Sequence, residues 1–337
     1  MSHPYPESYK APPLPYSFLK RRLHSLTGML LILFLIEHLL SNSQAALWLG
    51  EDGEGFIRAA NFLHSLPYIQ VLEWALLGIP FLLHSYWGIR SLFTVRFNSF
   101  RGDSSSVSLP SYSRNQAFTW QRLSALFLIC ALLYHVLEMR FWGYPLDLPG
   151  VGQRNYAVLI DLDVGAYTVA SRLQATVLDQ KDYARLIQGK EVIALRKVRA
   201  LAQEKNILRR SNIPIPVRIL QEEQEIETTK RWVASMKKKA VQKGQALVIA
   251  ANFGTALLFV VRDTFKSVWV AIFYTLFVIS AVFHACNGLW TYCIVWGITL
   301  TEKSRTFMRR FSMFLMACLM FLGLAAIWGT FWINLRQ

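Results

Sequence analysis

The sequence predicts an all-α integral membrane protein, a bundle of five transmembrane helices with a long extra-membrane insertion between the third and the fourth. Two observations lead to this fold class. The 337 residues are 53% hydrophobic, and the apolar residues gather in stretches that reach the roughly 20 helical residues needed to cross a bilayer. A polar segment of mixed charge, residues 143–267, separates the first three stretches from the last two.

The first predicted helix needs one decision, because Lys20-Arg21-Arg22 followed by an apolar run can mimic a cleavable signal peptide. Glu37-His38 interrupts that run, and reading through Leu47 lengthens it to spanning size, so we expect a retained helix. The five predicted spans lie near residues 26–48, 69–93, 118–142, 268–298 and 311–334. The chain then divides into a cytoplasmic N-terminal segment (1–22), helices one to three (23–142), an outer-side insertion (143–267) and helices four and five (268–337).

The insertion contains its own structural signals. NYAVLIDLDV is typical of a strand, and EVIALRKVRALAQEKN is typical of a helix. The uncharged run QALVIAANFGTALLFVV, residues 245–261, could be mistaken for a sixth crossing. Asn252 and Gly254 interrupt it, and a sixth crossing would reverse the next helix, so we expect a packed or interfacial segment.

The basic residues predict the orientation. One side of the membrane has two basic residues in its short segments, Arg58 in the first connection and Arg336 after the last helix. The other side therefore carries the excess of Lys and Arg that the positive-inside rule assigns to the cytoplasm. We therefore expect a multi-pass protein of the cell inner membrane with a cytoplasmic N-terminus, and the net charge of +15 requires no nucleic acid. The basic residues on the cytoplasmic side are Lys10, Lys20, Arg21, Arg22, Arg90, Arg96, Arg101, Arg114, Arg122, Lys303, Arg305, Arg309 and Arg310.

The four cysteines predict no metal site or disulfide framework. All four lie in predicted helices and none forms a CxxC pair, so neither an iron–sulfur cluster nor a disulfide scaffold is indicated.

Four of the seven histidines lie well inside predicted helices, one in each of the first four. At 1.5 Å of rise per residue, His38 and His135 lie about 18 Å above the inner ends of their helices. His84 lies about 20 Å below the outer end of its descending helix, and His284 falls at a similar depth. The four imidazoles therefore form an outer pair, His38 with His135, and an inner pair, His84 with His284, at levels about 10 Å apart.

Two pairs on four helices match what two stacked bis-histidine haems require, because low-spin haem iron takes one axial nitrogen from each face. A histidine in lipid can instead hydrogen-bond a neighbouring helix, and zinc is disfavoured since no carboxylate or thiolate cluster accompanies the histidines. Gly88 and Gly288, one turn beyond His84 and His284, would leave room for a flat macrocycle. The basic residues that could neutralise propionates are Arg22, Arg90, Arg96 and Arg122.

Several motifs together resemble the succinate dehydrogenase/fumarate reductase cytochrome b family, in its five-helix dihaem branch. They are FLKRRLHSLTG with IEHLL, LLHSYWGI, the QR of TWQRLSA with LYHVLE, and FHACNGLWTYCIVWGIT. The resemblance covers roughly residues 16–142 and 262–335. The insertion departs from it, because members of that branch join helices three and four by a short connection.

The resemblance implies the same histidine pairing, two haem b groups, and a quinone, menaquinone, as substrate. It also implies a flavoprotein subunit and an iron–sulfur subunit on the cytoplasmic face. The chain has no dinucleotide-binding glycine fingerprint and no cysteine cluster, so succinate oxidation itself would take place on those partners. The expected function is that of the membrane-anchor cytochrome b subunit of succinate dehydrogenase, which passes electrons between the iron–sulfur subunit and quinone.

Alternatives stay open at this point. The same helices could anchor a formate dehydrogenase or a hydrogenase, the complex could run as a fumarate reductase, and a transporter or receptor would need no haem. Quinone chemistry moves protons, so a titratable group is expected near its pocket, and His64 is the candidate for proton exchange on the outer side. Glu37, Glu73 and Glu138 could relay protons, and His24 could bond a propionate or lie among the lipid headgroups.

Overall fold

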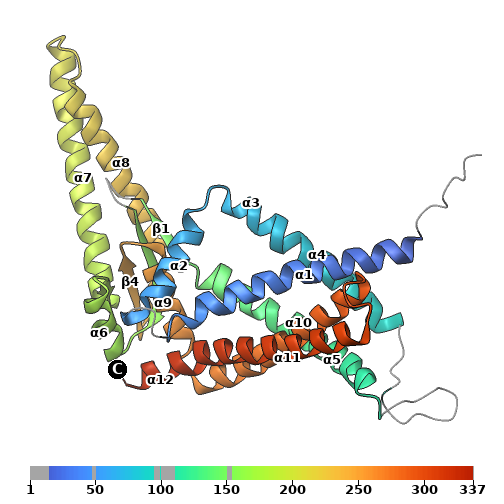
Figure 1. Cartoon of the computed structure of the whole chain (residues 1–337). Coiled ribbons are helices and arrows are strands. Elements are labelled where there is room, and N and C mark those ends of the chain that lie inside the picture. The colour runs from blue at the N-terminus through green and yellow to red at the C-terminus, as the bar shows by residue number, and fades with distance from the viewer. Residues whose placement is uncertain (1–14, 48–50, 95–98, 100–110, 150–153, 337) are drawn as a thin grey trace, which may run out of the picture. The chain divides into compact units, whose positions relative to one another are not determined.

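The computed structural model describes residues 15–47, 51–94, 99, 111–149 and 154–336. Three of the basic residues counted above, Lys10, Arg96 and Arg101, lie outside the described residues. The described part contains five helices that are long and apolar enough to cross a membrane, as predicted (Figure 1). Only 6–28% of the residues in the most apolar window of each are buried, which leaves apolar side chains facing outward as a lipid solvent requires.

The spanning helices are continuous or contain one π-helical turn. The bounds of the continuous helices are α1 Tyr16–Ser43 and α10 Val268–Val295. The other three spans are α3 Ile69–Glu73 with η2 Trp74–Gly78 and α4 Ile79–Thr94, α5 Ser113–Val136 with η3 Leu137–Trp142, and α11 Glu302–Leu324 with η4 Ala325–Gly329 and α12 Thr330–Leu335. These three π turns had no counterpart in the sequence prediction, and such turns are frequently found at functional sites.

Several helix boundaries differ from the predicted ones: α1 begins at Tyr16 rather than near residue 26, the third span begins at Ser113 and α10 ends at Val295. Hydrogen bonds account for two further differences. The first helix ends at Ser43 rather than near residue 48, because the Asn42 amide and the Ser43 hydroxyl donate to the carbonyls of His38 and Leu40 and satisfy the last turn. The fifth span begins nine residues earlier than expected. Thr301 and Ser304 exchange backbone-to-hydroxyl hydrogen bonds there, which is a capping arrangement that starts a helix.

The chain forms two compact units, and the boundary between them falls within each spanning helix. The first unit comprises Met1–Ile36, Gln70–Phe127 and Ser280–Cys318. Its buried core joins α1, α10 and α11, and contains Ile32, Ala285, Leu289 and Cys293. The second unit comprises Glu37–Ile69, Leu128–Ile279 and Leu319–Gln337, and therefore holds the whole insertion.

The insertion contains a four-stranded antiparallel sheet of order β1-β2-β4-β3, which corrects the all-α prediction. The strands are β1 Leu146–Leu148, β2 Asn155–Asp161, β3 Thr176–Leu178 and β4 Gln245–Ala250, with Val158 opposite Val248 in the centre. The strand prediction for NYAVLIDLDV is confirmed by β2. The sheet forms because β2 and β4 carry consecutive buried β-branched and small apolar residues, which suit a strand covered on both faces.

The uncharged run 245–261 is not a sixth spanning helix. It forms strand β4, turns at Ala251-Asn252, and continues as the 12-residue helix α9, Phe253–Thr264, which is too short to cross a bilayer. The Asn252 side chain caps α9 by accepting a hydrogen bond from the Thr255 amide at 2.8 Å. Nine of the residues in α9 are buried, so the expected packed segment is confirmed.

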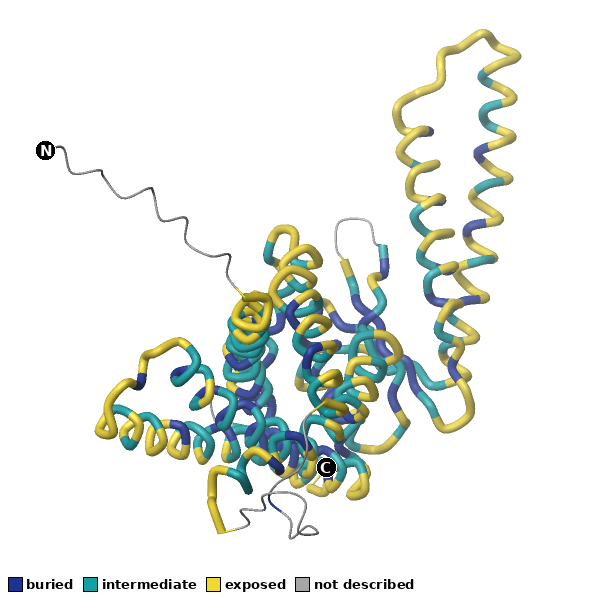
Figure 2. The backbone as a smooth tube through the Cα atoms, turned by 90° about the vertical axis from the view of Figure 1, so that its right-hand side faces the viewer, coloured by how far each residue is buried: buried dark blue, intermediate teal, exposed yellow. Residues whose placement is uncertain are grey.

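A long helical hairpin leaves the sheet and returns to it. Its helices are α7 Gln180–Arg210 and α8 Val217–Lys237, and the short helix α6 Val164–Arg172 precedes them. Most hairpin residues are exposed, with buried positions along the facing sides (Figure 2). The acidic and basic residues of this segment pair across the hairpin. Four ion pairs join α7 to α8: Lys197–Glu225, Lys205–Glu223, Arg218–Glu204 and Lys237–Glu191.

The insertion is fastened to the first connection between spanning helices. That connection contains the short turn η1 Glu51–Gly53 and the helix α2 Glu54–Ser65, and α2 lies against α9. The Asn61 side chain of α2 donates from Nδ2 to Asn252 Oδ1 at 3.1 Å, and its Oδ1 accepts a hydrogen bond from the Gly254 backbone amide at 2.7 Å. A Cβ at Gly254 would lie 2.4 Å from the Ile57 carbonyl oxygen, so only glycine permits this approach.

Candidate functional site

His38 of α1 and His135 of α5 face each other in the second unit. Their ring centroids are 5.8 Å apart and the ring planes are nearly perpendicular, at 83°. Both side chains are half-buried. The helices thus bring together two imidazoles that are 97 positions apart in the chain, and this pairing agrees with the one predicted from depth.

His84 of α4 and His284 of α10 form a second pair with closely similar geometry in the first unit. Their centroids are 6.2 Å apart and their planes make an angle of 79°. Each predicted pair is therefore present within one unit. The separation of the two levels stays a prediction.

In both pairs the Nδ1 atoms are engaged by neighbouring groups. His84 Nδ1 lies 3.1 Å from the His24 carbonyl oxygen, and His284 Nδ1 lies 3.2 Å from the Gln121 carbonyl oxygen. His135 Nδ1 is 3.2 Å from the Tyr274 hydroxyl, and His38 Nδ1 is 3.4 Å from the Asn42 side-chain amide. Where an oxygen can accept the Nδ1 proton, as at His84, His284 and His135, the contact fixes the ring and leaves Nε2 for a metal. At His38 the Asn42 amide nitrogen is a donor, so that contact does not select the same tautomer.

The ring separations suit an iron ion between each pair. Metal–imidazole bonds of about 2 Å on either side would hold two ring centroids roughly 6 Å apart, and both observed separations are close to that value. Among the described residues, no group of three or more His, Cys, Asp and Glu side chains could hold a metal ion. The donor set is two neutral nitrogens per site, which is the set that six-coordinate haem iron takes in addition to its macrocycle.

Glycines give the His84 side the space it needs. A Cβ at Gly28 would lie 2.9 Å from Cε1 of the His84 ring, so the absence of a side chain there lets α1 approach that histidine. At Gly88 a Cβ would meet no described atom within 4 Å, and at Gly288 it would meet the Gln121 side chain at 3.8 Å. Gly88 thus leaves the open space that the sequence predicted. Gly28 was missed, although its position four residues after His24 could have suggested a role.

Gln121 and Asn287 explain two of the motifs noted in the sequence. The Gln121 amide donates to the His284 carbonyl at 3.0 Å and accepts from the Asn287 amide at 2.8 Å. The Ser124 hydroxyl lies 3.4 Å from His284 Nδ1. The Gln-Arg of α5 and the Asn-Gly of α10 are therefore joined by hydrogen bonds that hold the His284 ring in place.

His24 lies against the His84–His284 pair rather than in a separate boundary site. Its ring centroid is 4.4 Å from that of His84 and 6.2 Å from the nearer ring of Trp87. Among the basic residues expected to neutralise propionates, Arg22 lies over the Trp296 ring at 4.7 Å, and Arg122 is buried and donates to the Leu92 carbonyl at 2.7 Å. Arg90 is exposed at the end of α4, and Arg96 lies outside the described residues. Their role toward propionates stays a prediction.

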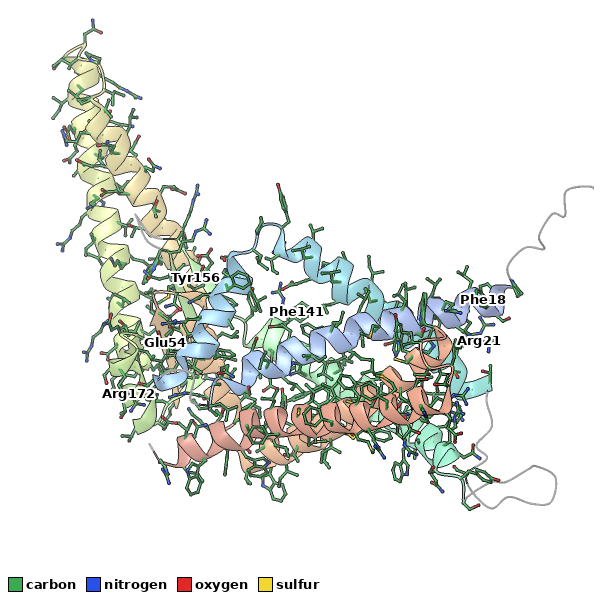
Figure 3. The ribbon with its side chains drawn as sticks, viewed as in Figure 1. Phe18, Arg21, Glu54, Phe141, Tyr156 and Arg172 are labelled. Atoms are coloured by element: carbon green, nitrogen blue, oxygen red, sulfur yellow. The ribbon has the colours of Figure 1, made fainter. Side chains whose placement is uncertain are left out.

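His64 lies among aromatic residues of the insertion. Its ring stacks on Phe253 of α9 with centroids 4.0 Å apart. Tyr156 of β2, which is labelled in Figure 3, meets it edge-on with centroids 5.7 Å apart. The Tyr156 hydroxyl is 3.4 Å from His64 Nε2. The ring therefore helps to join α2 to the insertion, and proton exchange by this residue stays a prediction.

The intramembrane carboxylates have polar partners. Glu37 accepts a hydrogen bond from Ser41 one turn later at 2.7 Å, and Glu138 accepts one from the Tyr274 hydroxyl at 3.1 Å. Glu73 is half-buried in α3. Glu138 is thus the carboxylate that shares a hydrogen-bond partner, Tyr274, with one of the paired histidines.

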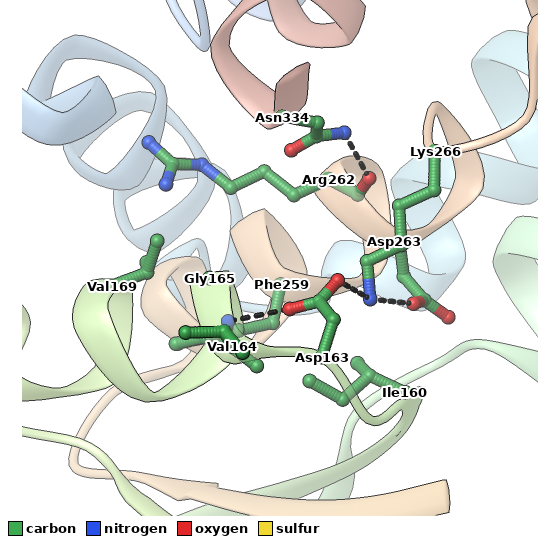
Figure 4. A pocket seen from close by; sticks show the side chains of 11 residues that line it. Ile160, Asp163, Val164, Gly165, Val169, Phe259, Arg262, Asp263, Lys266 and Asn334 are labelled. Carbon is green, nitrogen blue, oxygen red and sulfur yellow. Dashed lines mark hydrogen bonds and ion pairs between the residues drawn. The ribbon is translucent and has the colours of Figure 1, made fainter. Parts of the chain in front are cut away.

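A small cavity of about 240 Å³ is lined in part by Lys266, Asp163 and Asp263, which pair with one another (Figure 4). Lys266 lies 2.8 Å from carboxylate oxygens of both Asp163 and Asp263 and donates to the Asp161 carbonyl at 2.6 Å. Burial alone would lower the pKa of Lys266, but the two carboxylates outweigh it and raise that pKa. The cluster joins the start of α6 to the end of α9 and is a structural clamp.

Comparison with known proteins gives one informative similarity. The chain is 35% identical over 124 residues to the succinate dehydrogenase cytochrome b558 subunit of Bacillus subtilis (strain 168). The aligned stretch covers 36% of this chain and 55% of that protein, so this is distant and partial homology, and the chain matches little more than half of the relative's length. No family model matches the chain. No solved structure matches it either.

Proposed function

We propose that this chain is the membrane-anchor cytochrome b subunit of a succinate:quinone oxidoreductase and holds two haem b groups. The observation that carries the proposal is the pair of facing imidazoles in each unit, with ring centroids 5.8 and 6.2 Å apart and every Nδ1 engaged elsewhere. The partial homology to a succinate dehydrogenase cytochrome b558 subunit supports the same assignment. His38 and His135 would hold one haem, and His84 and His284 the other.

A haem accepts and releases one electron at a time, and that is the chemistry it would supply between an iron–sulfur partner and quinone. The chain's own residues provide the rest. Gln121 and Asn287 orient the His284 ring, Gly28 admits the His84 ring, and Tyr274 orients the His135 ring. Arg22 and Arg122 supply positive charge in the first unit. Succinate oxidation belongs to the proposed flavoprotein and iron–sulfur partners.

The proposed orientation places the N-terminus in the cytoplasm and the insertion on the opposite side. The contact of α2 with α9 supports it, since α2 lies in the basic-poor connection between the first two spans. The end of the fifth span also reaches the insertion, because Asn334 donates to the Arg262 carbonyl at 2.7 Å. The first connection, the insertion and the C-terminal end then share one side, as five crossings require. The proposed partners would bind the basic, cytoplasmic ends.

The function is tested by a redox-titrated optical spectrum of the purified protein, combined with haem quantification and identification of co-purifying subunits. We expect two b-type haems per chain, with two resolved reduction steps, and a flavoprotein and an iron–sulfur protein in the same complex. A colourless protein would exclude the proposal and favour a transporter or receptor. Two haems with a formate dehydrogenase or hydrogenase partner would reassign the anchor.

The side on which the insertion lies can be measured by cysteine labelling. Gln224 is exposed on α8, and the described insertion residues include no cysteine. A Gln224→Cys variant in intact cells should react with a membrane-impermeant thiol reagent without lysis, with unchanged haem content. The unsubstituted chain is the control for reaction at its native cysteines. Protection until the membrane is broken would contradict the proposed orientation.

His64 is proposed to exchange protons with quinone on the outer side. His64→Ala removes both the titratable group and the stacking contact with Phe253, whereas His64→Phe keeps the aromatic contact. We expect both variants to retain their haems and to lose quinone-linked succinate turnover by roughly tenfold or more, since removing a positioned proton-transfer group typically costs 10²–10⁴-fold. Normal turnover in His64→Phe would leave His64 with a packing role alone.

A further inference from the structure

Three side chains form a continuous hydrogen-bonded chain beside the His38–His135 pair. His135 Nδ1 is 3.2 Å from the Tyr274 hydroxyl oxygen, and that hydroxyl is 3.1 Å from Glu138 Oε2. Tyr274 is buried, with 5% of its surface exposed. His135 and Glu138 come from the third span, at its passage from α5 into the π turn η3, and Tyr274 comes from α10.

The chemistry of the groups fixes the direction of the chain. A phenol has one proton, and an ionised carboxylate can only accept, so the Tyr274 hydroxyl donates to Glu138. Its oxygen then accepts a hydrogen bond from the Nδ1–H of His135, which leaves Nε2 of that ring without a proton and able to bind a metal.

The other paired histidines have different partners. Nδ1 of His84 and Nδ1 of His284 meet neutral backbone carbonyls, and Nδ1 of His38 meets an amide side chain. At His135, by contrast, a hydroxyl links the ring to a carboxylate. The two pairs therefore differ in the electrical character of their surroundings although their ring geometry is similar.

A negative group that attracts the Nδ1 proton makes the opposite nitrogen a stronger electron donor. A stronger axial donor stabilises oxidised haem iron and lowers its reduction potential. We infer that Glu138, acting through the Tyr274 hydroxyl, lowers the reduction potential of the haem held by His38 and His135. Tyr274 and Glu138 are positioning residues, and the inference rests on the two haems proposed above.

A packing role for Tyr274 makes a different prediction. Its ring contacts Phe265 and Phe277, with centroids 5.2 and 5.9 Å away. Tyr274→Phe keeps those contacts and deletes only the hydroxyl, so a residue that served packing alone would lose little. Glu138→Gln keeps an acceptor oxygen for Tyr274 and deletes the charge. The two variants therefore separate the hydroxyl from the charge.

The experiment is a redox-titrated optical spectrum of the purified complex carrying Tyr274→Phe, Glu138→Gln, or both substitutions. A His84→Ala background, which should retain only the His38–His135 haem, assigns the signals. We expect each single variant to shift the potential of that haem upward and to leave the other haem unchanged. The double variant should match Tyr274→Phe alone, because the charge acts through the hydroxyl. Tyr292→Phe, which removes a hydroxyl from the same helix within the first unit, is the control and should titrate as the unsubstituted protein.

The outcomes are distinguishable. An unsubstituted protein without two haems would overturn the proposed function itself. Two haems whose potentials are identical in the unsubstituted protein, Tyr274→Phe and Glu138→Gln would overturn the inference and leave the function standing. A shift in Tyr274→Phe without one in Glu138→Gln would remove Glu138 from it. If Tyr274→Phe fails to accumulate, Glu138→Gln alone decides, since it preserves the hydrogen-bond acceptor.

Discussion

Replacing His38 or His135 with alanine should remove the same haem, and replacing His84 or His284 should remove the other. A haem iron of this kind takes two histidine nitrogens, and the structure places His38 opposite His135 at 5.8 Å and His84 opposite His284 at 6.2 Å. Haem content should therefore fall from two per chain to about one in all four single variants, an expectation set by the two-ligand requirement. The two members of a pair should leave the same optical spectrum and reduction step behind.

His24 and His64, which are not proposed haem ligands, serve as controls for this experiment. His24→Ala should retain both haems. The optical signal of the haem held by His84 and His284 should change, because the His24 and His84 ring centroids are 4.4 Å apart. His64→Ala should retain both unchanged, since His64 contacts the insertion. If the His38 and His284 variants lost one common redox component, the pairing would be wrong.

A branched side chain at Gly254 should release the insertion from the first connection. A Cβ there would lie 2.4 Å from a backbone oxygen and 2.9 Å from a backbone carbon of Ile57, and backbone atoms cannot turn aside as a flexible side chain can. Gly254→Val should lower the free energy of unfolding by about 3 kcal/mol or more. The thermal midpoint of the purified protein should then fall by roughly 6–12 °C.

Gly189 of α7 provides the matched control. A Cβ there meets no described atom within 4 Å, and the residue is exposed in a helix interior. Gly189→Ala should therefore stabilise the hairpin by up to about 1 kcal/mol, the helix-propensity difference between the two residues. If Gly254→Val were as stable as the unsubstituted chain, α2 and α9 would not be held together as closely as described.

The sequence predicted the spans and the histidine pairs because both depend on regular spacing. An apolar stretch of sufficient length reports a spanning helix, and a constant rise per residue converts position into depth. Position along the helices was therefore enough to predict that His38 pairs with His135 and His84 with His284.

Contacts between distant segments could not be predicted in this way. Tyr274 lies on a different helix from His135, and no spacing rule links the two. The sheet was predicted only at β2, because β4 is hidden in an apolar run that also suits a helix. No sequence pattern marks the π turns η2, η3 and η4. Because a π turn departs from the period of 3.6 residues, that period alone would misplace a side chain such as Glu138.

The hydrogen bond between Asn61 and Asn252 joins residues 191 positions apart in the chain. This separation in sequence determines how long after α2 its partner is synthesised. At 5–20 residues per second, a ribosome needs roughly 10–40 s to make the intervening chain. During that interval α2 has left the ribosome while its partner helix does not yet exist. The His84–His284 pair has the same order of events, because His284 follows His84 by 200 positions. The contact of the first connection with α9 and the His84–His284 pair can thus form only late, after the insertion has been synthesised.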